Sequence, residues 1–255
     1  MALILLSTNL EAGKSVIYGK NEDYAGKELS FFVYEDLISK KTRNIVSLKV
    51  DSQGNFRKEF EISAQKPIFC LTGIYKIWFV AKPGNEYKIA LPDFMPQTNA
   101  EKYNPYFKPV YLMAGVITND NNDPNNLIND FQYDFRTIVD DNIIEFMTEG
   151  KRSDVHKYID SLKQKYPHDN IDYFKTWKKY RLAKLRRIAY ERNHRYVINK
   201  YFRKDKVHYQ NPAYMEMFLD LFQDYFGHFL LRPDGKELLE AVNKYKSPTQ
   251  ISKVL

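Results

Sequence analysis

Residues 44–62 read NIVSLKVDSQGNFRKEFEI, and this stretch decides the fold class of the first part of the chain. Val46, Leu48 and Val50 alternate with other side chains in the two-residue period of a strand with one buried face. The polar turn that follows ends at Gly54, which can adopt a positive φ. The next segment places its large apolar side chains on one face: Phe56, Phe60 and Ile62. The stretch therefore predicts two consecutive strands with a turn between them.

Short strand-like segments recur on both sides of this stretch, at a spacing of roughly ten residues. The seven segments are 15–18, 28–34, 44–50, 55–62, 68–71, 74–81 and 87–91. Such a series, separated by turn residues, is typical of a sandwich of two sheets. We therefore expect an antiparallel β-sandwich of about seven strands over residues 14–92.

Residues 93–122 form a segment rich in proline and tyrosine. Pro96, Pro105 and Pro109 prevent a long regular element here, because proline lacks a backbone N–H donor. We expect this segment to be a linker. Its tyrosines suggest that it packs against something, either the sandwich itself or a ligand.

From residue 123 the apolar residues recur at the helical spacing of three and four. Asp123 and Asn211 each stand before a proline, in the order of a helix cap and a first helical residue. The expected helices start at Pro124, cover 153–166, 169–193, 212–229 and 238–245, and begin again at Pro248. The chain is thus predicted to be α+β, with an all-α part over residues 123–255.

Charge is distributed unevenly in a chain whose net charge is +7. Residues 118–149 carry eight acids against Arg136 alone, whereas residues 175–206 carry thirteen bases against two acids. The basic run is interleaved with aromatics, as in helices that bind nucleic acid or an anionic surface. The candidate contacts for such a surface are Lys178, Lys179, Arg186 and Arg187. The alternative, which we favour, is that these bases are solvated or pair with the acidic helix inside the protein.

Few residues in the chain are arranged for chemistry. Cys70, the single cysteine, lies in the apolar run PIFCL, where we expect a buried structural thiol. The histidines lack the spacing of a metal-binding pair, and no glycine-rich phosphate loop or nucleophile elbow is present. We therefore expect no catalytic residue, no cofactor-binding residue and no metal ligand, so the chain is not expected to be an enzyme.

The first residues, MALILLS, are apolar but have no basic residue before Lys14. Residues 1–13 are expected to be either the remnant of a signal peptide or a disordered end.

Five stretches of the sequence resemble a known group of proteins. They are YAGKELSFFVYEDLI (24–38), VDSQGNFRKEFEI (50–62), IWFVAKPGNEYKIALP (77–92), AEKYNPYF (100–107) and HYQNPAYMEMF (208–218). The chain is similar to the N-terminal region of Gram-negative envelope proteins related to the TlpA-type thiol-disulfide oxidoreductases. In that group a DUF4369-like β-domain precedes a helical region, and a thioredoxin-like domain comes last.

The chain departs from that group at the position of its chemistry. The redox activity of the group rests on a Cys-x-x-Cys motif, and this sequence has neither the motif nor the domain that carries it. The resemblance implies a location in the cell envelope, a thioredoxin-like domain or another envelope protein as partner, and a non-catalytic scaffold role. It also implies a gene fragment or a split version of the longer protein.

Overall fold

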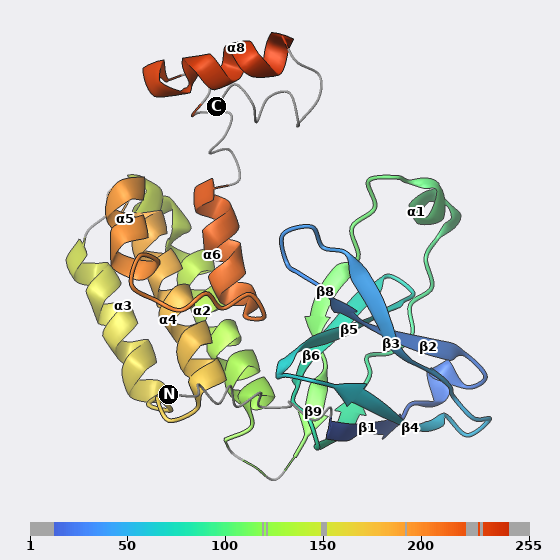
Figure 1. Ribbon diagram of the computed structural model, residues 1–255. Coiled ribbons are helices and arrows are strands. Elements are labelled where there is room, and N and C mark those ends of the chain that lie inside the picture. The colour runs from blue at the N-terminus through green and yellow to red at the C-terminus, as the bar shows by residue number, and fades with distance from the viewer. Residues whose placement is uncertain are drawn as a thin grey trace, which may run out of the picture.

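The computed structural model describes residues 13–118, 120, 122–148, 152–191, 193–222, 229 and 232–244. Within these residues, two β-sheets are followed by a group of helices (Figure 1). The prediction of an α+β fold in two parts is therefore confirmed. Of the leader expected over residues 1–13, only Gly13 is described, and it begins the first strand. Most of the predicted 212–229 helix beyond Phe222 and the helix expected from Pro248 lie outside the described residues.

All seven predicted strands are present, and the segment predicted as a linker adds two more. The strands are β1 (Gly13–Lys20), β2 (Glu28–Tyr34), β3 (Thr42–Lys49), β4 (Asn55–Ile62), β5 (Lys66–Thr72), β6 (Tyr75–Ala81), β7 (Glu86–Ala90), β8 (Val110–Met113) and β9 (Gly115–Ile117). One sheet has the order β4-β1-β7-β9 and the other β3-β2-β5-β6-β8.

The turn around Gly54 carries the chain from one sheet to the other. Strands β3 and β4 are consecutive in sequence, yet each lies at the edge of a different sheet. Gly54 has φ +83°, and a Cβ at this position would lie 2.6 Å from the backbone oxygen of Asn21. The turn therefore requires glycine both for its backbone conformation and for the close approach.

The sheets are mixed, whereas the sequence led us to expect an antiparallel sandwich. Strand β1 pairs with β7 in parallel, and β6 pairs with β8 in parallel. The other strand pairs are antiparallel. The residue pattern predicted where strands form but not the direction in which distant strands meet, because parallel partners are joined by long connections.

Strand β6 is buried on both faces, and its two faces belong to different cores. Ile77 and Phe79 pack inside the sandwich, while Trp78 and Val80 join the core of the helical part. Asn125 fixes this contact because its side chain accepts a hydrogen bond from the backbone N–H of Val80 (2.6 Å) and donates one to the Val80 carbonyl (3.0 Å). The continuous apolar run IWFVA is thus a strand covered on both sides.

The segment after β7 projects from the sandwich as a loop that contains the short helix α1 (Asn99–Tyr103) (Figure 1). Thr98 and Glu101 close a capping box at its start. Tyr103 and Tyr106 are each 85% exposed, so these two do not pack against the sandwich, which was one of the two partners expected for the tyrosines of this segment. Tyr111, at the end of the segment, does pack, because it stacks on Trp78 at 5.6 Å between ring centroids.

The helical part follows the predicted starts. Its elements are α2 (Pro124–Thr148), α3 (Arg152–Lys165), α4 (Asp172–Ala189), α5 (His194–Tyr201), α6 (Pro212–Phe222), a 3₁₀ turn (Pro233–Gly235) and α8 (Lys236–Lys244). Asp123 accepts a hydrogen bond from the N–H of Asn125, and Asn211 accepts from those of Ala213 and Tyr214. Among the described helices, none is long and apolar enough to cross a membrane.

The helix expected over residues 169–193 is shorter, and a second helix follows it. Helix α4 ends at Ala189, and Asn193 starts α5 by accepting a hydrogen bond from the N–H of Tyr196. Glu191 lies buried between them and accepts hydrogen bonds from Lys200 (2.5 Å) and Tyr201 (3.0 Å). The basic composition continues across this break, so it did not reveal the break in the sequence.

Candidate functional site

The structure assigns two of the four candidate anion contacts to intramolecular pairs. Lys178 is 6% exposed, and its Nζ lies 2.7 Å from both the Tyr166 carbonyl oxygen and a carboxylate oxygen of Asp169. Lys179 Nζ lies 2.6 Å from Asp205 Oδ2. Lys178 therefore holds the turn before α4 in place.

Arg186 and Arg187 are partly buried near the end of α4. Arg187 donates to the carbonyl oxygen of Asp220 at 3.4 Å and contacts His194 at 3.3 Å. The four candidates therefore do not form one exposed basic surface, since Lys178 is buried and Arg187 contacts two other helices.

The charge match expected for the basic helix involves different acids from those we predicted. Among the described residues, the bases of α4 form ion pairs with acids that do not belong to α2. Those acids are Asp169, Asp205, Glu216 and Asp220. Helix α6 packs against α4 and supplies Glu216 and Asp220, which the sequence order alone did not place there.

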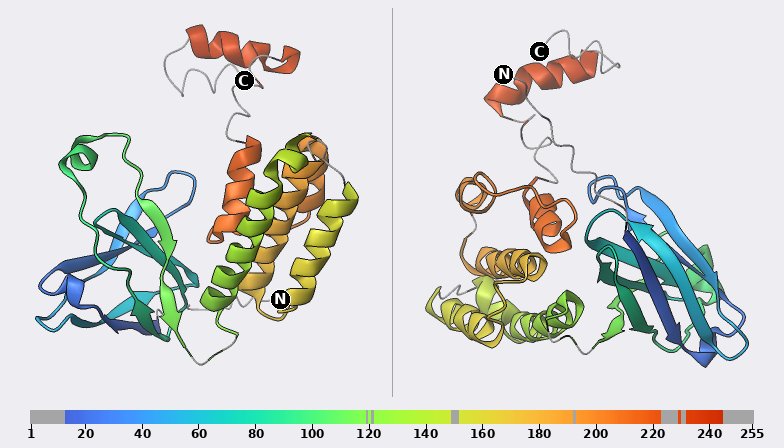
Figure 2. Two further views of the ribbon diagram at one scale, coloured as in Figure 1. Left: turned by 180° about the vertical axis from the view of Figure 1, so that it is seen from behind. Right: turned by 60° about the horizontal axis from the view of Figure 1, so that its bottom comes forward.

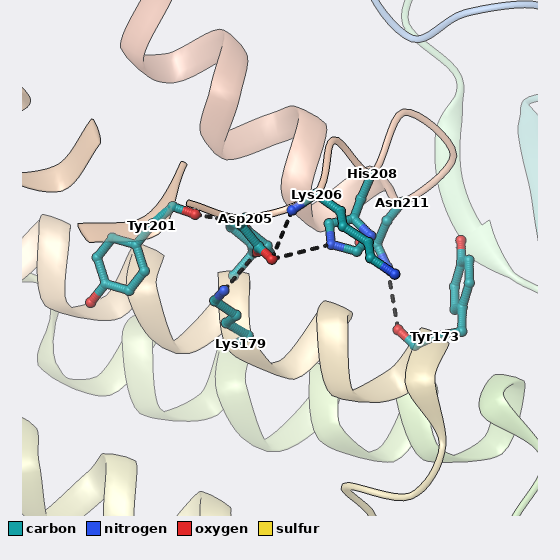
Figure 3. Close-up of polar contacts among 8 residues, drawn as sticks. Tyr173, Lys179, Tyr201, Asp205, Lys206, His208 and Asn211 are labelled. Carbon is teal, nitrogen blue, oxygen red and sulfur yellow. Dashed lines mark hydrogen bonds and ion pairs between the residues drawn. The ribbon is translucent and has the colours of Figure 1, made fainter. Parts of the chain in front are cut away.

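Asp205 is the centre of a cluster of polar side chains between α4 and the loop that precedes α6 (Figure 3). Its carboxylate accepts hydrogen bonds from Lys179 and Tyr180, both at 2.6 Å, and lies 3.8 Å from His208. Partial burial alone would raise the pKa of Asp205, but these two hydrogen bonds and the charge of Lys179 outweigh it and lower the pKa to about 2. The cluster lines a cavity of about 530 Å³.

A larger cavity, of about 750 Å³, lies between the sandwich and the helices. Its walls come from β6, β8 and the loop after β2 on one side and from α2, α4 and α6 on the other. Figures 1 and 2 show α2 and α6 facing the sheet edge formed by β6 and β8. The cavity therefore exists only because the two parts of the chain pack together.

Three stacked aromatic rings in the lining of this cavity join the sheet to the helices. Trp78 stacks on Tyr111 of β8 (5.6 Å, 20°) and on Trp177 of α4 (5.7 Å, 25°). The Arg181 guanidinium lies 4.8 Å from the centroid of the Trp177 ring. Lys76 lies 5.7 Å from the Tyr111 ring, so a cation stands at each end of the row.

The charged side chains that line the cavity are mostly basic. Among the described residues of the lining, four are basic and one is acidic: Lys40, Lys76, Arg136, Arg181 and Glu216. Burial lowers the pKa of Arg181, and the nearby Glu216 opposes that shift at a contact of 2.6 Å. Burial would raise the pKa of Glu216, but Arg181 and Lys184 hold it below its usual value. The single acid is thus ionised and already paired.

Three polar atoms on the cavity-lining residues have no hydrogen-bond partner within the described part of the chain. They are the amide oxygen of Gln132, the indole N–H of Trp177 and the Nε–H of Arg181. Trp177 is only 2% exposed. A buried polar group without a partner costs about 1–3 kcal/mol. All three atoms are themselves buried, so these residues line the cavity without presenting the unpartnered atoms to it.

The single cysteine is not part of this cavity. Cys70 is fully buried in the core of the sandwich, as expected, and burial raises the pKa of its thiol to about 12. In the described ranges, no three histidine, cysteine or acidic side chains gather closely enough to hold a metal ion. The groups that line the cavity are suited to stacking, charge pairing and hydrogen bonding.

The sequence did not reveal this cavity. Trp177 lies within the helix predicted over residues 169–193, at an apolar position that is buried in the structure. The signal that the sequence offered is its two tryptophans, Trp78 and Trp177, since both of them line the cavity. The positions that surround them lie far apart in sequence, so their meeting depends on how the sandwich docks on the helices.

No protein-family model matches the chain, and no curated protein matches it.

Proposed function

We propose that the chain is a non-catalytic binding protein whose binding site is the cavity between the sandwich and the helices. The observation that carries this proposal is the cavity of about 750 Å³ between the two parts of the chain, whose lining combines both tryptophans with basic side chains. Ligand sites commonly combine an apolar wall with a few convergent polar groups, and this cavity has that composition.

The two tryptophans provide a direct test, because both line the cavity and the chain has no others. We would screen aromatic and aliphatic acids, their amides and amines by thermal unfolding and by tryptophan emission. A ligand at about a hundred times its Kd adds about 2.7 kcal/mol to the free energy of unfolding. We expect the compounds that raise Tm to change tryptophan emission as well.

A variant that fills the cavity locates the effect. Asn129 is exposed and lines the cavity, so Asn129→Phe should block entry and leave the fold intact. Asn199→Phe places the same side chain at an exposed position of α5 outside the cavity wall and serves as the matched control. Stabilisation that survives Asn129→Phe and leaves tryptophan emission unchanged would place binding elsewhere and contradict the proposal.

The sequence resemblance supports a biological setting for this binding role. We propose that the chain acts in the cell envelope of a Gram-negative bacterium as a scaffold for a thioredoxin-like domain. The exposed Tyr103 and Tyr106 on the projecting loop supply aromatic side chains of the kind enriched in protein interfaces.

Size-exclusion chromatography with a thioredoxin-like protein from a neighbouring gene tests this setting. We expect co-elution that is lost when Tyr103 and Tyr106 are both changed to serine. Independent elution of the unmodified chain would count against a thioredoxin-like partner but would not affect the cavity, which the two tryptophans report separately.

A further inference from the structure

Strand β8 is an edge strand whose outer side pairs with no other strand among the described residues. It ends the five-stranded sheet and pairs with β6 in parallel. The backbone N–H groups of Val110 and Ala114 donate at 2.8 Å to carbonyl oxygens on the β6 side. Because alternate residues of a strand direct their backbone groups to the same side, those of Tyr111 and Met113 point away from β6. These two residues therefore offer N–H and C=O groups to a further strand.

The other edge strands have features that discourage a further strand. Strand β4 (NFRKEFEI) has exposed charged side chains along its length, and β9 has only three residues. Strand β3 has exposed charges at Arg43 and Lys49 and an irregular pairing with β2. Charges, irregular pairing and short length are the usual ways in which proteins protect sheet edges. Strand β8 (VYLM) has no charged residue, and Val110 and Tyr111 are each 46% exposed.

The cavity between the sandwich and the helices borders this edge. Tyr111, Leu112 and Met113 of β8 line it, and α2 and α6 contribute to the opposite wall (Figure 2). Tyr111 stacks on Trp78, and Met113 packs against the core of the helical part, so this face of β8 points to the helices. Every second side chain of an added strand would point the same way, towards the cavity.

The accessible charge beside the edge is positive. Lys40 and Arg136 are exposed on the cavity wall and have no ion-pair partner among the described residues. Glu216, the acid in the described lining, is already paired with Arg181 and Lys184. The potential at this edge therefore favours a partner with acidic side chains.

We infer that β8 binds an extended acidic peptide segment as an additional strand of the five-stranded sheet. The inference rests on the proposed binding function and names the partner as a polypeptide. Main-chain hydrogen bonds to Tyr111 and Met113 supply the affinity, and the bases on the wall select acidic side chains.

Peptides selected on the full chain from a random phage-displayed library test the inference. We expect the selected sequences to be rich in Asp and Glu. A synthetic copy of one selected peptide is then N-methylated at alternate residues, in each of the two possible registers. Only one side of an added strand faces β8, so one register should bind at least about tenfold more weakly by calorimetry and the other should bind nearly as before.

A matched pair of variants locates the edge. Tyr111→Pro and Tyr111→Ala both remove the ring, but only proline also removes the outward N–H. The pairing with β6 does not use this N–H, and proline is tolerated at such positions of edge strands. We expect Tyr111→Pro to bind the peptide about tenfold more weakly than Tyr111→Ala. The methylated peptides test the same bonds on the unmodified chain if Tyr111→Pro does not fold.

A second pair of variants tests the charge preference. Arg136→Gln should weaken binding of the acidic peptide by about threefold. Arg195→Gln, at an exposed position of α5 outside the cavity lining, should leave it unchanged. Equal losses in both would overturn the acidic class, because the effect would then be one of overall charge.

The remaining outcomes separate this inference from the proposed function. Selection of no peptide, or equal affinity of both methylated registers, would overturn strand addition. Self-association of the chain that Tyr111→Pro abolishes, and that the peptide does not inhibit, would assign the edge to a second copy and also overturn it. Small molecules that raise Tm and change tryptophan emission would still support the cavity as a binding site in each of these cases.

Discussion

Helix α4 contributes to two polar regions that are built in opposite ways. Around Asp205 each of the groups that meet has a protein partner: the carboxylate is bonded by Lys179 and Tyr180, and the Tyr180 hydroxyl also donates to the Tyr201 carbonyl at 2.8 Å. On the wall of the larger cavity, Trp177 and Arg181 carry N–H groups without partners among the described residues. The same helix therefore contributes to a network whose polar groups are hydrogen-bonded and to a cavity wall with polar groups that are not.

The difference teaches how to tell a structural polar cluster from a binding wall. A satisfied network stabilises the fold, so removing a member costs stability. An unsatisfied buried group destabilises the fold, and such groups persist at sites where function requires them. Removing a polar group should therefore lower the free energy of unfolding in the network and raise it at the cavity wall, and the direction of the change can be measured.

The largest effect is expected at the centre of the network. Asp205→Ala removes the acceptor of two charge-assisted hydrogen bonds and leaves Lys179 without its ion-pair partner, so we expect the free energy of unfolding to fall by about 3 kcal/mol. Urea denaturation measures it. Asp140→Ala, at an exposed position of α2, is the control and should change it by less than about 0.5 kcal/mol. A loss at Asp205 no larger than that of the control would show that the network contributes nothing and would break the comparison.

Acid should weaken the same network by a smaller amount. The pKa of Asp205 is lowered to about 2 in the folded chain, and its unfolded value is about 3.9. A group with a depressed folded pKa stabilises the fold above its unfolded pKa, and this stability is lost as the pH falls from about 4 towards 2. The effect is smaller than that of Asp205→Ala, because a protonated carboxyl group keeps part of its hydrogen bonding.

Urea denaturation at neutral pH and near pH 3, in the unmodified chain and in Asp205→Asn, isolates this contribution. The variant should lose less stability on acidification than the unmodified chain. An identical loss in both would assign the acid sensitivity to other carboxylates.

The sequence predicted the elements of the fold far better than their partners. Alternation at Val46, Leu48 and Val50 and the glycine at Gly54 are local signals, and the strands and turn lie where they indicate. The parallel pairing of β1 with β7 depends on the path of about seventy residues, and no local pattern encodes it. Strands β8 and β9 were missed for the same reason, since their pairing partners lie earlier in the chain.

The candidate site was harder to predict than the fold, because composition does not show which charges meet. Lys178 belongs to a strongly basic run, yet it is buried against Tyr166 and Asp169. The cavity depends on Trp78 of a strand meeting Trp177 of a helix. Each tryptophan alone looks like an ordinary core residue, and only the docking of the two parts brings them to one wall.

On the cavity wall we expect a substitution to raise the free energy of unfolding, in contrast with the loss expected around Asp205. Gln132→Leu removes a buried amide oxygen that has no partner among the described residues, so we expect the free energy of unfolding to rise by about 1 kcal/mol. Gln164→Leu, at an exposed position of α3, is the matched control and should have an effect of less than about 0.5 kcal/mol. A loss of stability in Gln132→Leu would mean that this oxygen is satisfied in solution, and the distinction between wall and network would fail.

The smallest effect is expected for the more exposed partner in the network. The Lys179 side chain is 43% exposed, and that of Asp205 is 25% exposed. Lys179→Gln can keep a hydrogen bond to Asp205 and leaves the carboxylate bonded to Tyr180, so we expect a loss of about 0.5 kcal/mol, which is typical of an exposed ion pair. Lys175→Gln, an exposed neighbour on the same helix, controls for the change in net charge. High salt should shrink the difference between the two variants, because screening weakens the pair of Lys179 with Asp205. A difference that salt does not change would show that hydrogen bonding, rather than charge, makes Lys179 part of the network.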